Sequence, residues 1–204
     1  MRKFNIIVSL LVLLTASAAM AQDMPQLFVE APDTVLPLLT RNNRADCVDF
    51  LDAKMRARVT NRLDGRSELL SISDDFLELR NSESSTVQMK LLPFGEDTII
   101  AVVRSVCAEA CDSRLSFYNK DWSQANVTFS RPPIKDFFIP TDSLDFLMAR
   151  CDIYLVRLSL SPVDNVLTAD YTMPQYMSEE DSALVAPKLR TLRYRWNGVS
   201  FVRE

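Results

Sequence analysis

Five short β-rich runs follow one another through the middle of the chain, with turn residues between them. In the run 86–92, apolar Val87, Met89 and Leu91 alternate with polar Gln88 and Lys90, which indicates a strand with one wet face. The five runs cover residues 67–72, 76–80, 86–92, 98–106 and 114–118. Their close spacing predicts an antiparallel meander sheet.

A second, smaller group of elements is predicted after Pro132-Pro133, which forms the internal boundary. Thr141 is predicted to cap one short helix and Ser178 to begin another. Asn197-Gly198 is typical of a two-residue type I′ hairpin turn, because both positions of that turn need positive φ. Helices are expected at 142–149 and 178–186, and strands at 126–129, 152–160, 166–172, 189–196 and 199–202.

One long helix is predicted near the start of the chain, over residues 43–63. Asn43 can cap it, and apolar residues recur at spacings of three and four, at Val48, Leu51, Met55 and Val59. The segment 22–42 carries three prolines and is predicted to be an extended lead-in. The expected fold is therefore α+β, with antiparallel meander sheets, a long N-terminal helix and two short helices.

Similar endings in the two halves suggest an internal duplication of a helix-plus-sheet unit. Each predicted unit follows a helix with a meander and ends on an aromatic segment, around Trp122 in the first and Trp196 in the second. Aromatic hairpin endings are also common without duplication. The predicted division is a first unit over 43–131 and a smaller one over 132–204, packed as one globular body.

The N-terminus has the layout of a secretory signal peptide. Arg2 and Lys3 precede the apolar run 6–14, and Ala19 and Ala21 provide small residues for a cut between Ala21 and Gln22. The alternatives are a membrane anchor or a buried core helix. Because the two basic residues leave with the predicted segment 1–21, the net charge falls from −4 to −6.

The residue after the cut and the charge of the mature chain predict its location. Gln22 stands where a bacterial lipoprotein would carry cysteine, and no second apolar segment is long enough to span a bilayer. We therefore expect a soluble periplasmic or secreted protein with no stable membrane insertion. The acidic balance and the lack of a basic run argue against nucleic acid as a partner.

Two shortages exclude several classes of chemistry. The chain has no histidine, which removes Ser-His and Cys-His nucleophiles and His-ligated zinc. Its three glycines are scattered, so no phosphate-binding glycine loop can be written. No catalytic residue, metal site or cofactor is predicted.

Four cysteines in an oxidising compartment favour disulfides. Cys107 and Cys111 are the preferred pair, because they flank a tight loop between two predicted strands. Cys47 and Cys151 then either pair or remain buried thiols. A redox site at Cys107 and Cys111, or a metal site that adds Glu109, is a weaker interpretation because neither spacing is the usual one.

Three surfaces are candidates for binding or chemistry. Carboxylate pairs are the only acid–base groups left, such as Asp74-Asp75 and the acids at 179–181, and a turn and a helix cap explain these better than catalysis does. Arg190, Arg193 and Arg195 form a basic stripe on the last hairpin that could grip an acidic ligand, or serve solubility. An aromatic surface is the third candidate, although its alternation favours the core: Tyr118, Trp122, Tyr194 and Trp196.

The chain resembles a family of secreted Bacteroidales proteins of unknown function, domain of unknown function 3256. The resemblance rests on the signal peptide, the length, the segment Thr34-Val35-Leu36-Pro37-Leu38-Leu39-Thr40, the helix from Asn43 to Leu63, and the segment from Cys107 through Cys111-Asp112-Ser113-Arg114-Leu115-Ser116-Phe117-Tyr118 to Trp122. It implies a periplasmic or outer-surface setting in a Gram-negative bacterium and carries no activity onto any residue.

Two functions are compatible with these patterns. The first is a non-enzymatic, exported module that binds an unknown envelope protein or ligand. The alternative is a carboxylate-based hydrolase that acts on glycan or peptide, which would need two convergent acids in a cleft.

Overall fold

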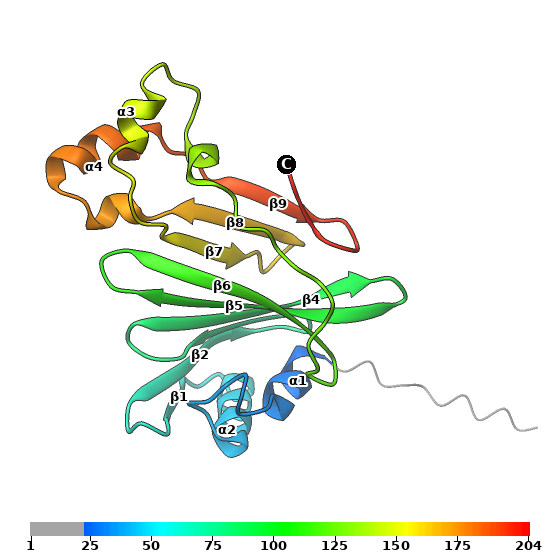
Figure 1. The fold of residues 1–204 in the computed structure, drawn as a ribbon. Helices are drawn as coiled ribbons and strands as arrows, with labels where there is room; N and C mark the ends of the chain where they lie inside the picture. Colours follow the sequence, from blue (N-terminus) through cyan, green and yellow to red (C-terminus); the bar gives the residue numbers. More distant parts are fainter. Residues whose placement is uncertain (1–22) are drawn as a thin grey trace, which may run out of the picture.

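The computed structural model describes residues 23–204. The predicted signal peptide and its cut between Ala21 and Gln22 lie outside the described residues. The described part forms two antiparallel sheets flanked by short helices at both ends of the molecule (Figure 1). This is a mixed α and β architecture, in agreement with the predicted class.

The first sheet has six antiparallel strands in sequence order, and the predicted meander is confirmed. The strands are β1 (Ala57–Thr60), β2 (Arg66–Ile72), β3 (Phe76–Arg80), β4 (Ser85–Phe94), β5 (Asp97–Cys107) and β6 (Cys111–Asn119). The five predicted runs correspond to β2–β6. Their alternation sends every second side chain to the same face, so this sheet has two apolar faces with different partners.

The long helix predicted over 43–63 is wrong. Helix α2 (Arg41–Asp52) is followed by β1, which pairs antiparallel with β2. Ala57 and Val59 face the core beneath the sheet, a period-two pattern that the helical spacing of Val48, Leu51, Met55 and Val59 concealed. Asn43 is not the N-cap. It is the third helical residue and completes a capping box with Thr40.

The extended lead-in predicted over 22–42 is also wrong. Helix α1 (Met24–Glu30) lies within it, capped by Asp23, whose side chain accepts a hydrogen bond from the Gln26 N–H. Pro25 is tolerated because it lies in the first turn of the helix, where a backbone N–H would have no intrahelical acceptor, so proline costs no hydrogen bond there. Met24, Leu27 and Phe28 then share one face, and all three are fully buried against the sheet.

The second sheet has four antiparallel strands in the order β10-β9-β8-β7. They are β7 (Val156–Leu160), β8 (Val166–Tyr171), β9 (Leu192–Trp196) and β10 (Phe201–Arg203). Two short helices accompany this sheet, α3 (Leu144–Met148) and α4 (Glu179–Val185), and Ser178 caps α4 as predicted. Single 3-10 turns lie at Ile134–Phe137, Met173–Tyr176 and Ala186–Lys188.

Several predicted details of this half differ from the structure. Residues 126–129 form no strand, and Ser143 rather than Thr141 is the N-cap residue of α3. The Asn197-Gly198 turn is not a two-residue turn, because Trp196 pairs with Phe201 across a four-residue loop. The Asn197 side chain accepts hydrogen bonds from the Val199 and Ser200 N–H groups, which lengthens the turn.

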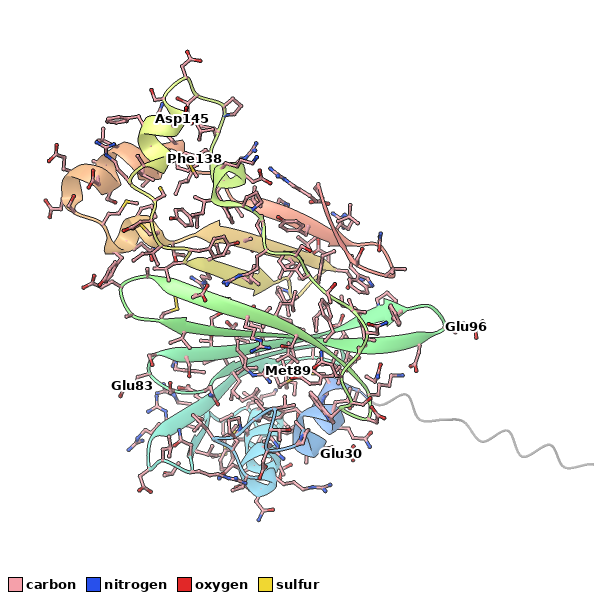
Figure 2. All side chains as sticks on the ribbon, viewed as in Figure 1. Glu30, Glu83, Met89, Glu96, Phe138 and Asp145 are labelled. Carbon is pink, nitrogen blue, oxygen red and sulfur yellow. A yellow bond between two sulfur atoms is a disulfide. The ribbon has the colours of Figure 1, made fainter. Side chains whose placement is uncertain are left out.

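The first sheet is the middle layer of the molecule (Figure 1). One face packs on α1 and α2, where the labelled Met89 lies (Figure 2). The other face packs on the second sheet through one continuous core that includes Ile99, Ala101 and Phe117. Residues of β7, β8 and β9 meet them there, among them Leu158, Ala169 and Trp196.

Strand β7 lies along the first sheet, and three of its backbone N–H groups donate hydrogen bonds to side chains of that sheet. The Val156 N–H donates to Asp112, the Leu158 N–H to the Ser113 hydroxyl at 3.0 Å, and the Leu160 N–H to the Gln88 amide oxygen at 2.9 Å. These N–H groups lie on the edge of β7 that has no strand beside it. The two sheets are therefore joined by polar side chains as well as by the apolar core.

The two tryptophans that suggested a duplication lie in different surroundings. Trp122 follows β6 in a turn at φ +64° and packs on the helix side of the first sheet. Trp196 is a strand residue in the core between the sheets, and its indole N–H donates to the Pro93 carbonyl at 2.6 Å. The duplication stays a prediction.

Candidate functional site

A groove of about 340 Å³ opens at the edge of β6, beside the junction of the two sheets. Strand β6 provides one wall, the segment that carries Phe129 and Arg131 provides the other, and Leu158 of β7 lies between them. This volume is at the lower end of the range for small-ligand sites. The lining combines three apolar side chains with charged groups: Asp112, Ser113, Arg114, Leu115, Phe129, Arg131 and Leu158.

At the outer edge of β6, the backbone of Cys111 and the carbonyls of Ser113 and Phe117 have partners, whereas Leu115 between them has none in the described part of the chain. Cys111 exchanges two hydrogen bonds with the Thr172 hydroxyl, and the Ser113 carbonyl accepts one from Arg131. The Phe117 carbonyl accepts from the Ala125 N–H. In an antiparallel ladder every second residue directs its N–H and C=O away from the paired strand, and on β6 these are Cys111, Ser113, Leu115 and Phe117. The N–H and C=O of Leu115 therefore point outward into the groove, where they have no partner within residues 23–204.

The charges around this gap are positive in balance. Arg131 forms an ion pair with Asp112 and stacks over the Tyr154 ring, 4.6 Å from its centroid. The Tyr154 hydroxyl donates to the Pro132 carbonyl, and burial raises the pKa of this tyrosine. Arg114 forms no ion pair in the described part of the chain, so one guanidinium is available to a ligand.

This geometry suits binding rather than acid–base chemistry. Asp112 is the one carboxylate of the groove, and it is engaged by Arg131 and by the Val156 N–H. The acid pairs predicted elsewhere lie apart from it: Asp75 pairs with Lys90, and Asp181 pairs with Arg150 at the start of α4. No group of metal-ligating side chains gathers within residues 23–204. The hydrolase alternative therefore finds no pair of convergent acids in this groove.

The basic stripe predicted on the last hairpin is largely neutralised by the chain itself. Arg193 and Arg195 project from the outer face of β9, and both pair with Glu204, at 3.2 and 2.6 Å. Arg190 donates to the Asp136 carbonyl instead. Of the predicted aromatic surface, Tyr194 and Trp196 are buried in the core between the sheets.

Cys107 and Cys111 form a disulfide across the end of the β5–β6 hairpin. Cys47 and Cys151 are free thiols, and each is buried in a different core, on opposite faces of the first sheet. Burial raises the pKa of Cys47 to about 11, so this thiol is protonated and unreactive at neutral pH. Cys47 and Cys151 were predicted either to pair or to remain buried thiols, and in the structure they are buried thiols.

The family model for proteins of unknown function DUF3256 matches residues 16–201. The chain belongs to the DUF3256 family. The structure of a domain of an uncharacterised protein from Porphyromonas gingivalis W83 is similar to this DUF3256 chain, with 27% identity and a TM-score of 0.77. The likeness covers 90% of the present chain and 98% of that one. No curated protein matches. Among the described residues of this family member, no helix is long and apolar enough to cross a membrane.

A second charged feature of this DUF3256 chain was missed from the sequence. Glu68 of β2 is nearly buried and accepts hydrogen bonds from Arg56, from Arg58 of β1 and from Arg80 of β3. Arg66 lies on the same side of the sheet, and we call these four arginines with Glu68 the arginine face. The available signal was alternation, since Arg56 and Arg58 are two apart, as are Arg66 and Glu68, but assigning 43–63 to a helix hid it.

Acid should weaken the fold through Glu68. Hydrogen bonds from Arg56 above all, and from Arg58, lower the pKa of Glu68 from 4.5 to about 2. Because the folded-state pKa lies below the unfolded one, this contribution to stability is complete above about pH 4.5 and disappears as the pH falls through about 2. We expect Glu68→Gln to flatten this part of the curve of unfolding free energy against pH, measured by urea denaturation. Glu83→Gln, an exposed control, should leave it unchanged.

Proposed function

We propose that this chain is an exported, non-enzymatic binding module of the cell envelope, periplasmic or secreted, which captures an extended acidic peptide segment of another envelope protein. Export is supported by the pattern of residues 1–22 and by the disulfide of Cys107 and Cys111, a bond typical of oxidising compartments. The proposed division is a first unit over 43–131 and a second over 132–204, which act as one body because the groove takes residues from both.

The observation that carries the proposal is the gap in the pairing of β6 at Leu115. If an extended peptide lay along this edge, one of its carbonyls would accept a hydrogen bond from the Leu115 N–H, and one of its N–H groups would donate to the Leu115 carbonyl. This is recognition by strand addition. Leu115, Phe129 and Leu158 offer an apolar surface for one side chain of that peptide. Arg114 and Arg131 then favour a neighbouring carboxylate, because guanidinium and carboxylate form charge-assisted hydrogen bonds.

The backbone N–H of Leu115 provides a direct test. In Leu115→Pro the N–H is lost, but no ladder bond to β5 is broken, because this N–H points away from β5. The probe is an array of short capped peptides in which one Asp or Glu follows alternating apolar residues. We expect the native chain to bind a subset of the array, and Leu115→Pro to weaken that binding about tenfold or more.

Leu115→Ala is the matched control, since it removes the same side chain and keeps the N–H. It should bind more tightly than Leu115→Pro, and thermal unfolding of both variants verifies that they are folded. Equal affinity of the two variants would show that no strand is added at this edge, and an array without any binder would refute the proposed function.

A further inference from the structure

The arginine face lies on the part of the first sheet that the second sheet leaves uncovered. The second sheet packs over the other end, where β4, β5 and β6 contact β7. A shallow hollow of about 220 Å³ remains over β1–β3, next to the hairpin that carries the labelled Glu83 (Figure 2). All of its lining residues are charged: Arg58, Arg66, Glu68, Arg80 and Glu83.

Cross-strand register brings these arginines together. Glu68 stands directly opposite Arg58 on one side and Arg80 on the other, so the three side chains share one face. Arg56 reaches the same carboxylate in a two-pronged contact, at 2.6 and 3.0 Å. Neighbouring side chains across antiparallel strands lie roughly 5 Å apart at their Cβ atoms, so Glu68 is close to both Arg58 and Arg80, which stand on either side of β2.

Glu68 orders these guanidinium groups without using up their hydrogen-bonding capacity. Each guanidinium has five N–H groups, and Glu68 receives four hydrogen bonds from three arginines. The side chains of Arg56 and Arg80 are 62% and 46% exposed, so their remaining donors face solvent. The Arg66 guanidinium has no hydrogen-bond or ion-pair partner among residues 23–204, and Arg66 lines the same hollow. The result is a set of preordered donors in a chain whose net charge is negative.

The absence of apolar lining narrows the class of ligand. Protein partners are generally held by buried aromatic or aliphatic anchors, and single-stranded nucleic acid by stacking on aromatic rings. The hollow offers neither, since its five lining residues are all charged. A ligand must bind here through its anionic groups, and Arg is the side chain best matched to phosphate and sulfate oxygens.

We propose that the arginine face is a second binding site, which takes an oligosaccharide that carries several sulfate or phosphate groups. Arg56, Arg58 and Arg80 hold anionic groups through the donors that Glu68 leaves free, and Arg66 adds an unpaired guanidinium at the margin. The site is separate from the groove at Leu115, so either can fail without the other.

Three surface substitutions test this site without disturbing the fold. The probe is a heparin-derived sulfated oligosaccharide at low ionic strength, with a phosphorylated oligomannose as the second arm. Arg66→Gln should weaken binding about fivefold, and Glu83→Gln should strengthen it about twofold, because each changes one exposed charge at the hollow. Arg157→Gln is the matched control: it removes an exposed positive charge on β7 outside the hollow, and should leave the affinity unchanged.

The comparison probes decide the ligand class. Binding of the sulfated or the phosphorylated oligosaccharide, weakened by added salt and by Arg66→Gln, supports the site, and the two arms show which ester is preferred. Equal loss in Arg66→Gln and Arg157→Gln would mean that only overall charge matters, which would overturn the proposal. So would tighter binding of polyglutamate or single-stranded DNA than of both oligosaccharides, or no binding of either oligosaccharide.

Discussion

Replacing Phe117 with alanine should lower the free energy of unfolding by about 4 kcal/mol, because the side chain is 2% exposed and a large cavity would remain. Phe117 belongs to β6, yet its ring lies 5.9 Å from that of Trp196 and 6.3 Å from that of Phe201, both in the second sheet. The cavity would therefore open between the sheets. Urea denaturation followed by circular dichroism measures the change.

Phe146→Ala is the control for this loss. The substitution removes the same side chain, but Phe146 is 53% exposed and its ring lies against Arg150 at the surface, so the expected cost is below about 1 kcal/mol. In both variants a single unfolding transition is expected, because one core joins the sheets. Equal costs for the two variants, or separate transitions for the two sheets, would contradict this description of the core.

The second large effect is expected at Lys90, a lysine whose side chain is only 2% exposed. Its ammonium lies 2.7 Å from an Asp75 carboxylate oxygen and donates to the Pro162 carbonyl beyond β7. Asp75→Ala should lower the free energy of unfolding by about 3 kcal/mol, because it leaves a buried charge without a counter-ion. Thermal and urea unfolding of the variant measure this cost.

Replacing the lysine itself should be milder. Lys90→Met keeps the volume and removes the buried charge, and Asp75 remains half exposed to water, so the expected cost is about 1 kcal/mol. Asp74→Ala, next to Asp75, provides an exposed control and should have little effect. A larger loss in Lys90→Met than in Asp75→Ala would show that the lysine acts by hydrogen bonding and not as a charge that needs a counter-ion.

The fold was most predictable where a local pattern had one meaning. Alternating Val87, Met89 and Leu91 predicted a strand, and β3 was predicted with its exact bounds. The wet face predicted at Gln88 and Lys90 was wrong, because the second sheet covers it: Lys90 is only 2% exposed and Gln88 accepts a hydrogen bond from β7. Residues 43–63 failed because Val59 fits both a helical period and a strand period, and the pairing partner that decides between them is in β2. Local spacing does not include that partner.

The candidate site was beyond local patterns for a related reason. Asp112, Arg131 and Leu158 meet in one groove only because β7 runs along the edge of the first sheet, and no motif records which edge a second sheet will cover. The arginine stripe at Arg193 and Arg195 was visible as a pattern. What the pattern lacked was Glu204, which pairs with both.

The way β7 lies on the first sheet also bears on self-association. An uncovered strand edge can recruit the same edge of another molecule, which begins fibrous aggregation. The β7 edge is closed to such growth by Asp112, Ser113 and Gln88. Of the other outer strands, β1 and β10 have four and three residues, too short to template a long ladder, and β6 has partners at Cys111, Ser113 and Phe117 that leave only a short open stretch at Leu115. We therefore expect concentrated solutions of the chain to stay free of fibres, and substitutions that expose β7 to be the ones that induce them.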